Sequence, residues 1–452
     1  MNVREAIVSQ PMSRFQISVV ATCLLICMID GFEILVMGFV VPALGKAWHL
    51  SPVQVGYVLS AGIFGMAVGA TFLSPLADKF GRRKHVLLCM FLIVVGMAAS
   101  AAAPNLTWLL IARAFAGAFI GAIIASLNVT VAEFSSDRRR GTAMGVYGMG
   151  FPIGSSLGGF VSILLIGAYG WRAPLWFSAG VTFILFFVAL VMLPESINFL
   201  VEKRPANALK TYNKIGARLG ITPASELPPQ THYEVKATVG QSMFQGVMLK
   251  RTLLLWFGYA FLCASFYFAN TWTPKLLSDA TGIPMLGLRV GTIISVGGIV
   301  GAIGFALLSL RIHPRAAAVS LLWCGMIAFL LFANFFRAGS AAFVMAFFVG
   351  MCANGGIVAF FAISPPIYPT AVRSSGVGWM MACGRFASFL APIVTGYILA
   401  AGVTPKATYQ GYGLVIALAG VCIFLLHRSY KGVHAFDAMQ QESKAALQEA
   451  QA

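Results

Sequence analysis

The sequence predicts an all-α membrane protein with twelve transmembrane helices arranged as two six-helix halves. Of its 452 residues, 59% are hydrophobic and only 10% are charged, whereas soluble domains carry roughly 25% charged residues. The apolar residues fall into twelve long runs, each near the ~20 residues that a helix needs to cross a bilayer. The predicted spans are 15–41, 53–77, 85–103, 106–132, 141–166, 172–193, 251–277, 289–310, 315–334, 340–364, 374–400 and 408–428.

The widest gap between apolar runs, 194–250, predicts a central hydrophilic loop that joins the two halves. It contains several prolines and scattered charges. Within it, the spacing of its apolar residues predicts a surface helix over 206–219. The predicted domains are a first half at 1–193, the loop at 194–250, a second half at 251–430 and a polar cytoplasmic tail at 431–452.

The first span carries two carboxylates, Asp30 and Glu33, near its middle. Residues three apart lie on the same face of a helix, about one turn apart. A charge at mid-membrane depth costs ~2.5–3.5 kcal/mol on insertion scales, so packing alone does not explain two of them in a chain with only 14 Asp and Glu. A carboxyl group shielded from water can hold a proton near neutral pH. We interpret this pair as the proton-coupling and substrate-gating element of a secondary transporter.

Two arginines also fall inside spans. Arg113 in the fourth span has a depth within ~6 Å of Asp30, at ~1.5 Å of rise per residue, and Arg385 lies well inside the eleventh span. A guanidinium group can hold a substrate carboxylate through two parallel hydrogen bonds. Because an unpaired charge at this depth is costly, a structural ion pair between Arg113 and Asp30 is the alternative. For Arg385 the alternative is bonding to backbone carbonyls or extension toward the interface.

Uncharged polar and aromatic side chains within the spans are further candidate substrate contacts. An amide can bond to a substrate hydroxyl or join two helices, and an aromatic ring can stack on a substrate or simply pack. Both interpretations stay open for each residue. The candidates are Asn128, Asn354, Phe32, Tyr57, Tyr267 and Trp272.

The distribution of basic residues predicts that both termini are cytoplasmic. About four times as many Lys and Arg fall in the loops on the side of the N-terminus as in the loops on the other side. The formal net charge of +17 therefore follows the positive-inside pattern, and we expect no nucleic-acid partner.

Nothing in the sequence indicates an enzyme or a metal site. The eight cysteines all fall inside apolar runs, and the six histidines fall in loops or at span ends. None of them has metal-ligand spacing, and no nucleotide-binding or hydrolase motif is present. We therefore expect no catalytic residue, no cofactor and no metal ion.

The loop after the second span resembles a known signature. From Ser74 to Lys84 it reads S-P-L-A-D-K-F-G-R-R-K. Topogenic positive charge alone does not explain Asp78 or Gly81. The loop resembles G-x-x-x-D-[RK]-x-G-R-[RK] of the major facilitator superfamily, with Ser74 in place of the first glycine. In that family the acid and the arginines latch the two halves on the cytoplasmic side, which implies gating roles for Asp78, Gly81, Arg82 and Arg83.

Charges at other cytoplasmic span ends are predicted to join this latch. Glu133 closes the fourth span. Arg138 precedes the fifth span and Arg373 precedes the eleventh, each three residues before a glycine. The matching positions indicate a weak internal repeat between parallel halves, an architecture that transporters use.

Longer motifs narrow the resemblance to the aromatic acid:H+ symporter family. The D-G-F-E sequence that ends at Glu33 is similar to that family's D-G-[FLY]-D, and 11–16, 38–44 and 194–201 also match its motifs. Further similar stretches lie at 254–256, 271–274 and 368–386, so the resemblance covers nearly the whole chain. Glu33 replaces the family's Asp, which keeps the charge but adds a methylene.

The residues and the resemblance together predict a proton-coupled symporter that imports aromatic carboxylates, of the hydroxybenzoate or a related type, across a bacterial inner membrane. Asp30 would carry the coupling and Glu33 would adjust which acid is admitted. Alternating access would follow from rocking of the halves about a midplane site. The predicted partners are the aromatic acid, protons and the lipid bilayer, and the protein is expected to be a monomer. An H+-coupled exporter of aromatic or drug-like compounds and, less favoured, a membrane sensor of aromatic acids remain alternatives.

Overall fold

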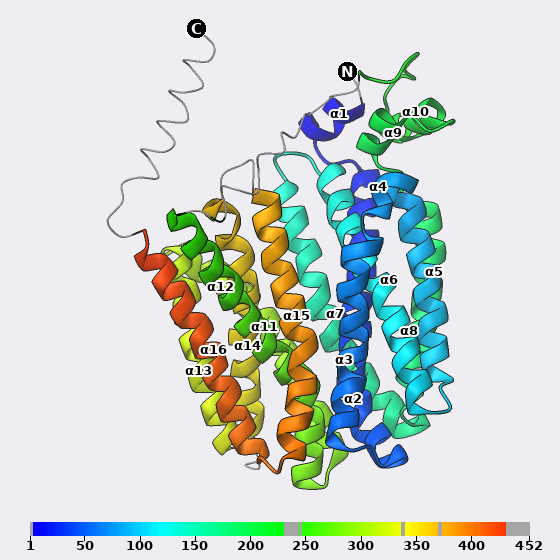
Figure 1. The fold of residues 1–452 in the computed structure, drawn as a ribbon. Coiled ribbons are helices and arrows are strands. Elements are labelled where there is room, and N and C mark those ends of the chain that lie inside the picture. Colours follow the sequence, from blue (N-terminus) through cyan, green and yellow to red (C-terminus); the bar gives the residue numbers. More distant parts are fainter. Residues whose placement is uncertain (1–2, 230–243, 245, 336–339, 369–372, 431–452) are drawn as a thin grey trace.

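The fold is known from a computed structural model that describes residues 3–229, 244, 246–335, 340–368 and 373–430. In these residues all regular elements are helical, and the long helices stand side by side in one bundle (Figure 1). The elements of the first half are α1 (Val3–Ser9), α2 (Arg14–Trp48), α3 (Pro52–Val68), the π-helix η1 (Gly69–Leu73), α4 (Leu76–Phe80), α5 (Arg82–Ala101), α6 (Leu106–Glu133), α7 (Arg140–Tyr169) and α8 (Ala173–Met192). They are followed by α9 (Ile197–Lys203), α10 (Ala208–Arg218), α11 (Gly246–Thr281), α12 (Pro284–Ser309), α13 (Pro314–Asn334), α14 (Ser340–Ile363), the 3-10 helix η3 (Pro365–Ile367), α15 (Arg373–Ala400) and α16 (Pro405–Arg428).

In the described part of the chain, twelve helices are long and apolar enough to cross a membrane. Their positions match the twelve predicted spans, so the all-α fold of two six-helix halves is confirmed. The predicted domain boundaries (1–193, 194–250 and 251–430) stay a prediction, and the predicted tail, 431–452, lies outside the described residues.

The first span is longer than predicted. It was expected to end at residue 41, but α2 continues through Pro42 and ends at Trp48. Transmembrane helices tolerate an interior proline because neighbouring helices and local adjustments satisfy the freed carbonyl. Ser13 begins this helix with a reciprocal capping box, in which its side chain accepts from the Gln16 N–H and the Gln16 side chain accepts from the Ser13 N–H.

The second span is interrupted where one continuous run was predicted. Helix α3 passes into the π-helix η1 and then into the short α4. Gly81 connects α4 to α5 with a φ of 98°, a region that favours glycine because it has no Cβ. A Cβ at Gly81 would also approach Glu195 Oε2 to 2.7 Å. This position therefore requires glycine for both backbone and packing reasons.

Helices α2 and α7 cross backbone to backbone. A Cβ at Gly31 would overlap the backbone of Phe151, and one at Gly154 would overlap the backbone of Met28. Small residues allow such close approach, which drives helix association where no hydrophobic effect operates. The crossing fixes α2, with its two carboxylates, against α7.

The predicted surface helix is confirmed as α10. It buries Tyr212 and Ile215, and the Val3 N–H of α1 donates to Tyr212 Oη at 3.1 Å. Helices α1, α9 and α10 lie together beyond the upper end of the bundle in Figure 1. We call this end the α9–α10 end, and the other end the opposite end.

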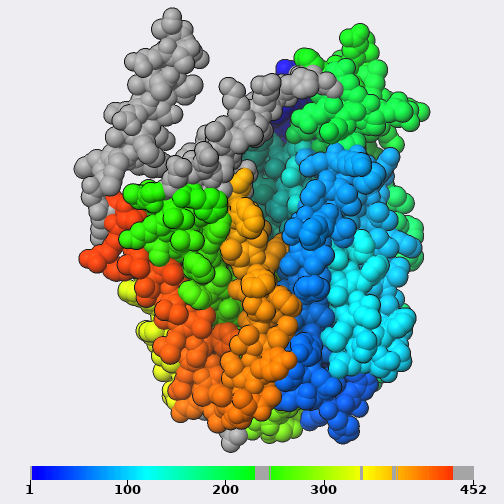
Figure 2. Space-filling view, in the orientation of Figure 1, coloured from blue at the N-terminus to red at the C-terminus, as the bar shows by residue number. Residues whose placement is uncertain are grey.

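The two halves touch at the opposite end and near their middle. Tyr57 Oη and Tyr397 Oη are 2.7 Å apart, and the Ser155 and Ser295 hydroxyls are 2.8 Å apart. In Figure 2, α15 (orange) and α3 (blue) meet low in the view and separate toward the α9–α10 end. There, a Cβ at Gly145 would find no atom within 4 Å. Among the described residues, the halves are thus in contact at the opposite end and apart at the α9–α10 end.

Candidate functional site

Asp30 and Glu33 are both buried in the first half, with 3% and 0% of their surfaces exposed. Asp30 lies beside Cys27 of its own helix, Cys89 of α5 and Tyr147 of α7. Its Oδ2 atom has no hydrogen-bond partner among the described residues. Desolvation without a partner is costly for an ionised carboxylate, so this environment suits a group that binds and releases a proton.

Glu33 faces α8. Its Oε1 accepts hydrogen bonds of 2.7 Å from both the Ser178 and Thr182 hydroxyls, whereas its Oε2 has no partner in the described part of the chain. The two predicted acids therefore differ, because Glu33 is held by two hydroxyl donors while Asp30 is enclosed by sulfur and aromatic groups. The structure places them in one cluster but gives them separate environments.

Arg113 lies beside Glu33 rather than Asp30. Its Nη2 donates to the Glu33 backbone oxygen at 2.7 Å, and its Nη1 points to Met97 Sδ at 2.9 Å. The alternative, an ion pair with Asp30, is not among the ion pairs of the described residues. Depth along a helix could be read from the sequence, but the direction in which each side chain leaves its helix could not.

A small pocket lies between the halves near their middle. Leu35 on α2 lines it, two residues after Glu33 and therefore on a different face of the helix, at about 100° per residue. The two acids are not part of its lining. The lining residues are Leu35, Phe151, Pro152, Ser155, Phe266, Asn270, Ile294, Ser295, Gly298, Gly350 and Asn354.

Of the predicted substrate contacts, Asn354 reaches this pocket. Its Nδ2 donates to the Gly298 backbone oxygen at 2.6 Å. Asn270, which was not among the predicted contacts, also lines the pocket, and its Nδ2 donates to Phe266 O of its own helix at 2.9 Å. An amide inside an apolar run was the available signal for Asn270, as it was for Asn354. Both amides leave a carbonyl oxygen that can accept from a substrate hydroxyl.

Arg385 and Tyr267 come together in the second half. Arg385, on α15, lies beside Tyr259, Cys263 and Tyr267 of α11. Its Nη1 is buried and has no hydrogen-bond partner among the described residues. A buried guanidinium with an unused donor is suited to bind a carboxylate. The geometry therefore favours substrate binding over the alternative in which Arg385 serves only backbone carbonyls.

Four other predicted contacts lie outside the pocket lining, and their contact with substrate stays a prediction. Phe32 packs on Phe177, with ring centroids 6.3 Å apart. Trp272 Nε1 donates to Pro392 O at 3.2 Å. Asn128 bonds within its own helix, to Ile124 O at 3.1 Å, and Tyr57 joins the halves at the opposite end.

The predicted gating residues form a network at the α9–α10 end, within the first half. Arg82 makes an ion pair with Glu133, lies 3.5 Å from Asp78 and donates to Ser196 Oγ at 3.2 Å. Asn198 Nδ2 donates to Glu133 at 2.9 Å. None of the ion pairs among the described residues crosses between the halves.

The remaining gating residues are placed apart from that network. Arg83 donates to the backbone oxygens of Leu193 at 2.8 Å and Leu190 at 2.7 Å, and so caps the C-terminus of α8. Arg138 and Arg373 are both exposed. No ion pair of the described residues therefore joins the halves at this end, and the gating role of these residues stays a prediction.

Comparison with known proteins identifies the relatives of this chain. A 4-hydroxybenzoate transporter, PcaK of Pseudomonas putida, is 32% identical over 394 residues, which cover 86% of this chain and 88% of that protein. A gallate transporter of Pseudomonas putida is 30% identical, with 93% and 94% covered. The inward-open xylose transporter XylE from E. coli shares the fold with a TM-score of 0.68 and 14% identity, over 90% of this chain and 96% of that one.

A family model provides independent support. The model of the Major Facilitator Superfamily matches residues 22–336. The relatives and this family are transporters and not enzymes, and the apolar helices make the protein a multi-pass membrane protein. The chain belongs to the Major Facilitator Superfamily.

Proposed function

We propose that this protein imports aromatic carboxylates by proton symport. The observation that carries the proposal is the carboxyl cluster of α2, where Asp30 and Glu33 are buried and each has an oxygen without a hydrogen-bond partner among the described residues. Relatives named as 4-hydroxybenzoate and gallate transporters support an aromatic acid as substrate. The buried acids Asp30 and Glu33 lie in the first half and Arg385 lies in the second, and this arrangement supports coupling of proton transport to substrate transport.

In this mechanism the substrate and the proton occupy different places. The substrate carboxylate binds Arg385 with help from the Tyr267 hydroxyl, and the ring lies toward the pocket that Asn270 and Asn354 line. The proton binds Asp30 inside the first half. Neutralising Asp30 removes the cost of a buried charge, so protonation changes the relative free energy of the two conformations of the bundle.

We assign the α9–α10 end to the cytoplasm of a bacterial inner membrane, with both termini on that side. The assignment rests on the excess of basic residues in the loops at that end. With this orientation, the contacts at the opposite end make the structure inward-facing. The protein acts as a monomer in this proposal, because both acids, both arginines and the pocket belong to one chain.

Uptake into proteoliposomes tests the proposal. An inward proton gradient should drive accumulation of labelled 4-hydroxybenzoate or gallate, and a protonophore should abolish it. Asp30→Asn should lose gradient-driven accumulation. Asp279→Asn is the matched control, since Asp279 is half exposed and pairs with Lys275 at 2.6 Å.

Two outcomes would contradict the coupling. One is uptake that a protonophore does not change, and the other is undiminished accumulation by Asp30→Asn. Accumulation only when the gradient is reversed would instead support the exporter.

Arg385→Lys separates the substrate role from the proton role, because loss of the bidentate fork should raise KM while the response to the proton gradient persists.

A further inference from the structure

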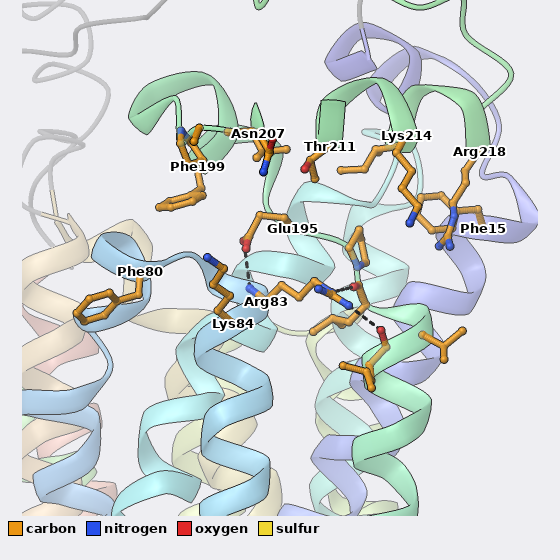
Figure 3. A pocket seen from close by; sticks show the side chains of 18 of the residues that line it. Phe15, Phe80, Arg83, Lys84, Glu195, Phe199, Asn207, Thr211, Lys214 and Arg218 are labelled. Atoms are coloured by element: carbon orange, nitrogen blue, oxygen red, sulfur yellow. Dashed lines mark hydrogen bonds between the residues drawn. The ribbon is translucent and has the colours of Figure 1, made fainter. Parts of the chain in front are cut away.

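One pocket in the described part of the chain is separate from the central pocket between the halves. It is a pocket of about 830 Å³ at the α9–α10 end, between the start of α5, the end of α8 and the helix α10 (Figure 3). It lies outside the network of Arg82 and Glu133 and is not shared with the central pocket. The transport proposal gives it no role.

The lining of this pocket is strongly basic. Figure 3 shows Lys214 and Arg218 coming from α10, and Arg83 and Lys84 at the start of α5. Lys79 adds a further positive charge, and the one acid among the lining residues is Glu195. The lining therefore carries a large excess of positive charge in a confined space.

Two of the charged groups are already satisfied by the protein. Glu195 Oε1 accepts from the backbone N–H groups of Arg83 at 3.1 Å and Ser196 at 3.0 Å. The Arg83 guanidinium is held by the carbonyls that end α8. Glu195 forms no ion pair with the remaining cations among the described residues.

Four cations of the lining are left without an acid. Lys79, Lys84, Lys214 and Arg218 are all exposed, and none belongs to an ion pair among the described residues. Lys214 and Arg218 are four residues apart on α10 and so project from the same face. Like charges that line one pocket without an ion-pair partner favour an anionic ligand.

The apolar surface next to the pocket indicates that this anion is attached to a lipid. Val191, at the end of α8, lines the pocket and is 64% exposed. Ile184 and Phe187 lie on the same face of α8 below it and are 64% and 49% exposed. This stripe is the face that the membrane-spanning α8 turns to the bilayer, so the pocket opens beside the bilayer. The headgroup of a phospholipid can enter the pocket there while its acyl chains lie along α8.

We propose that this pocket binds the headgroup of an anionic phospholipid. The phosphodiester group would sit between Lys84 and Lys214, and the acyl chains would lie along α8. Such a lipid would tie α10, in the segment between the two halves, to the start of α5, where Arg82 begins the gating network. Membrane composition would thereby act on the gate.

Lipid titration of the purified full-length protein tests the proposal. In detergent, phosphatidylglycerol should raise the thermal midpoint and should be retained in native mass spectra, whereas phosphatidylcholine and sodium phosphate should have little effect. Lys84→Gln/Lys214→Gln should weaken phosphatidylglycerol binding roughly 25-fold, at about fivefold for each lysine beside an anionic headgroup. Lys203→Gln/Lys210→Gln is the matched control, because both of these exposed lysines lie on α9 and α10 and outside the pocket lining.

Three results would overturn the proposal. Equal weakening in the two double variants would show a general charge effect instead of a site. A response to sodium phosphate that phosphatidylglycerol does not exceed would make the ligand a soluble anion. An equal response to phosphatidylcholine would remove the requirement for negative charge.

Discussion

Replacing Ser155 by alanine should shift the protein away from the conformation seen here. The hydroxyls of Ser155 on α7 and Ser295 on α12 are 2.8 Å apart and join the two halves. Ser155 and Ser295 have only 2% and 5% of their surfaces exposed. Water therefore does not replace the hydrogen bond between them while the opposite end stays closed. In the alternate conformation the halves separate there, and the bond is lost whether or not Ser155 is present.

The size of the shift follows from the burial of the pair. Leaving a buried hydroxyl without a partner costs about 1–3 kcal/mol. Ser295 can recover part of this by bonding to a carbonyl of its own helix, as buried serines commonly do, so we expect about 1 kcal/mol. That corresponds to a roughly fivefold shift of the equilibrium toward opening of the opposite end.

Distances between spin labels measure this equilibrium. Labels at Arg139 and Arg311, both exposed at the α9–α10 end, report the separation of the halves in a background without reactive cysteines. Ser155→Ala should gain a population with a shorter distance, because that end closes as the opposite end opens.

A matched serine provides the control. Ser156 is also buried, but its hydroxyl donates to Pro152 O of its own helix at 2.7 Å, so Ser156→Ala should leave the distances unchanged. Ser155→Ala/Ser295→Ala leaves no orphaned hydroxyl and should lie closer to the wild type than Ser155→Ala alone. Identical distances in Ser155→Ala and wild type would refute the reasoning.

Three further predictions concern stability. Gly154→Ala should lower the thermal midpoint by an amount equivalent to about 1–3 kcal/mol, because its Cβ would overlap the backbone of α2. Gly145→Ala is the control and should change the midpoint little, because its Cβ would lie in open space. Equal midpoints for the two variants would contradict the packing. Arg82→Gln should destabilise more than Glu133→Gln, because Arg82 also contacts Asp78 and Ser196; the opposite order in thermal melting would count against the network. Tyr212→Phe should speed tryptic cleavage at Arg4, because α1 loses the bond from Val3; unchanged cleavage would mean that apolar contacts alone hold α1.

The sequence was sufficient to predict the fold because composition and length dominate in a membrane. Each span had to be apolar and long enough, and those requirements can be read one residue at a time. The ends were harder to place, since α2 was predicted to end at residue 41 but continues through Pro42 to Trp48. The π-helix after α3 left no recognisable pattern in the sequence.

The site was predicted in part. Asp30 and Glu33 stood out because charge is rare at that depth. Arg82 followed from a loop signature, and Glu133 followed from its place at the end of the fourth span. The partner of Arg113 did not follow, because transmembrane helices are apolar on most faces and the hydrophobic pattern does not show which face meets which neighbour. Asn270 was missed for the same reason, although it lines the central pocket.

The close crossing of α2 and α7 has a mechanical consequence. Where Gly154 meets the backbone of Met28, there is no side-chain layer that could deform when a proton arrives or leaves. The two helices must therefore move together as one rigid body. A spectroscopic probe placed on α2 or on α7 should record the same rotation. The regions that deform during transport should lie at the contacts between the two halves.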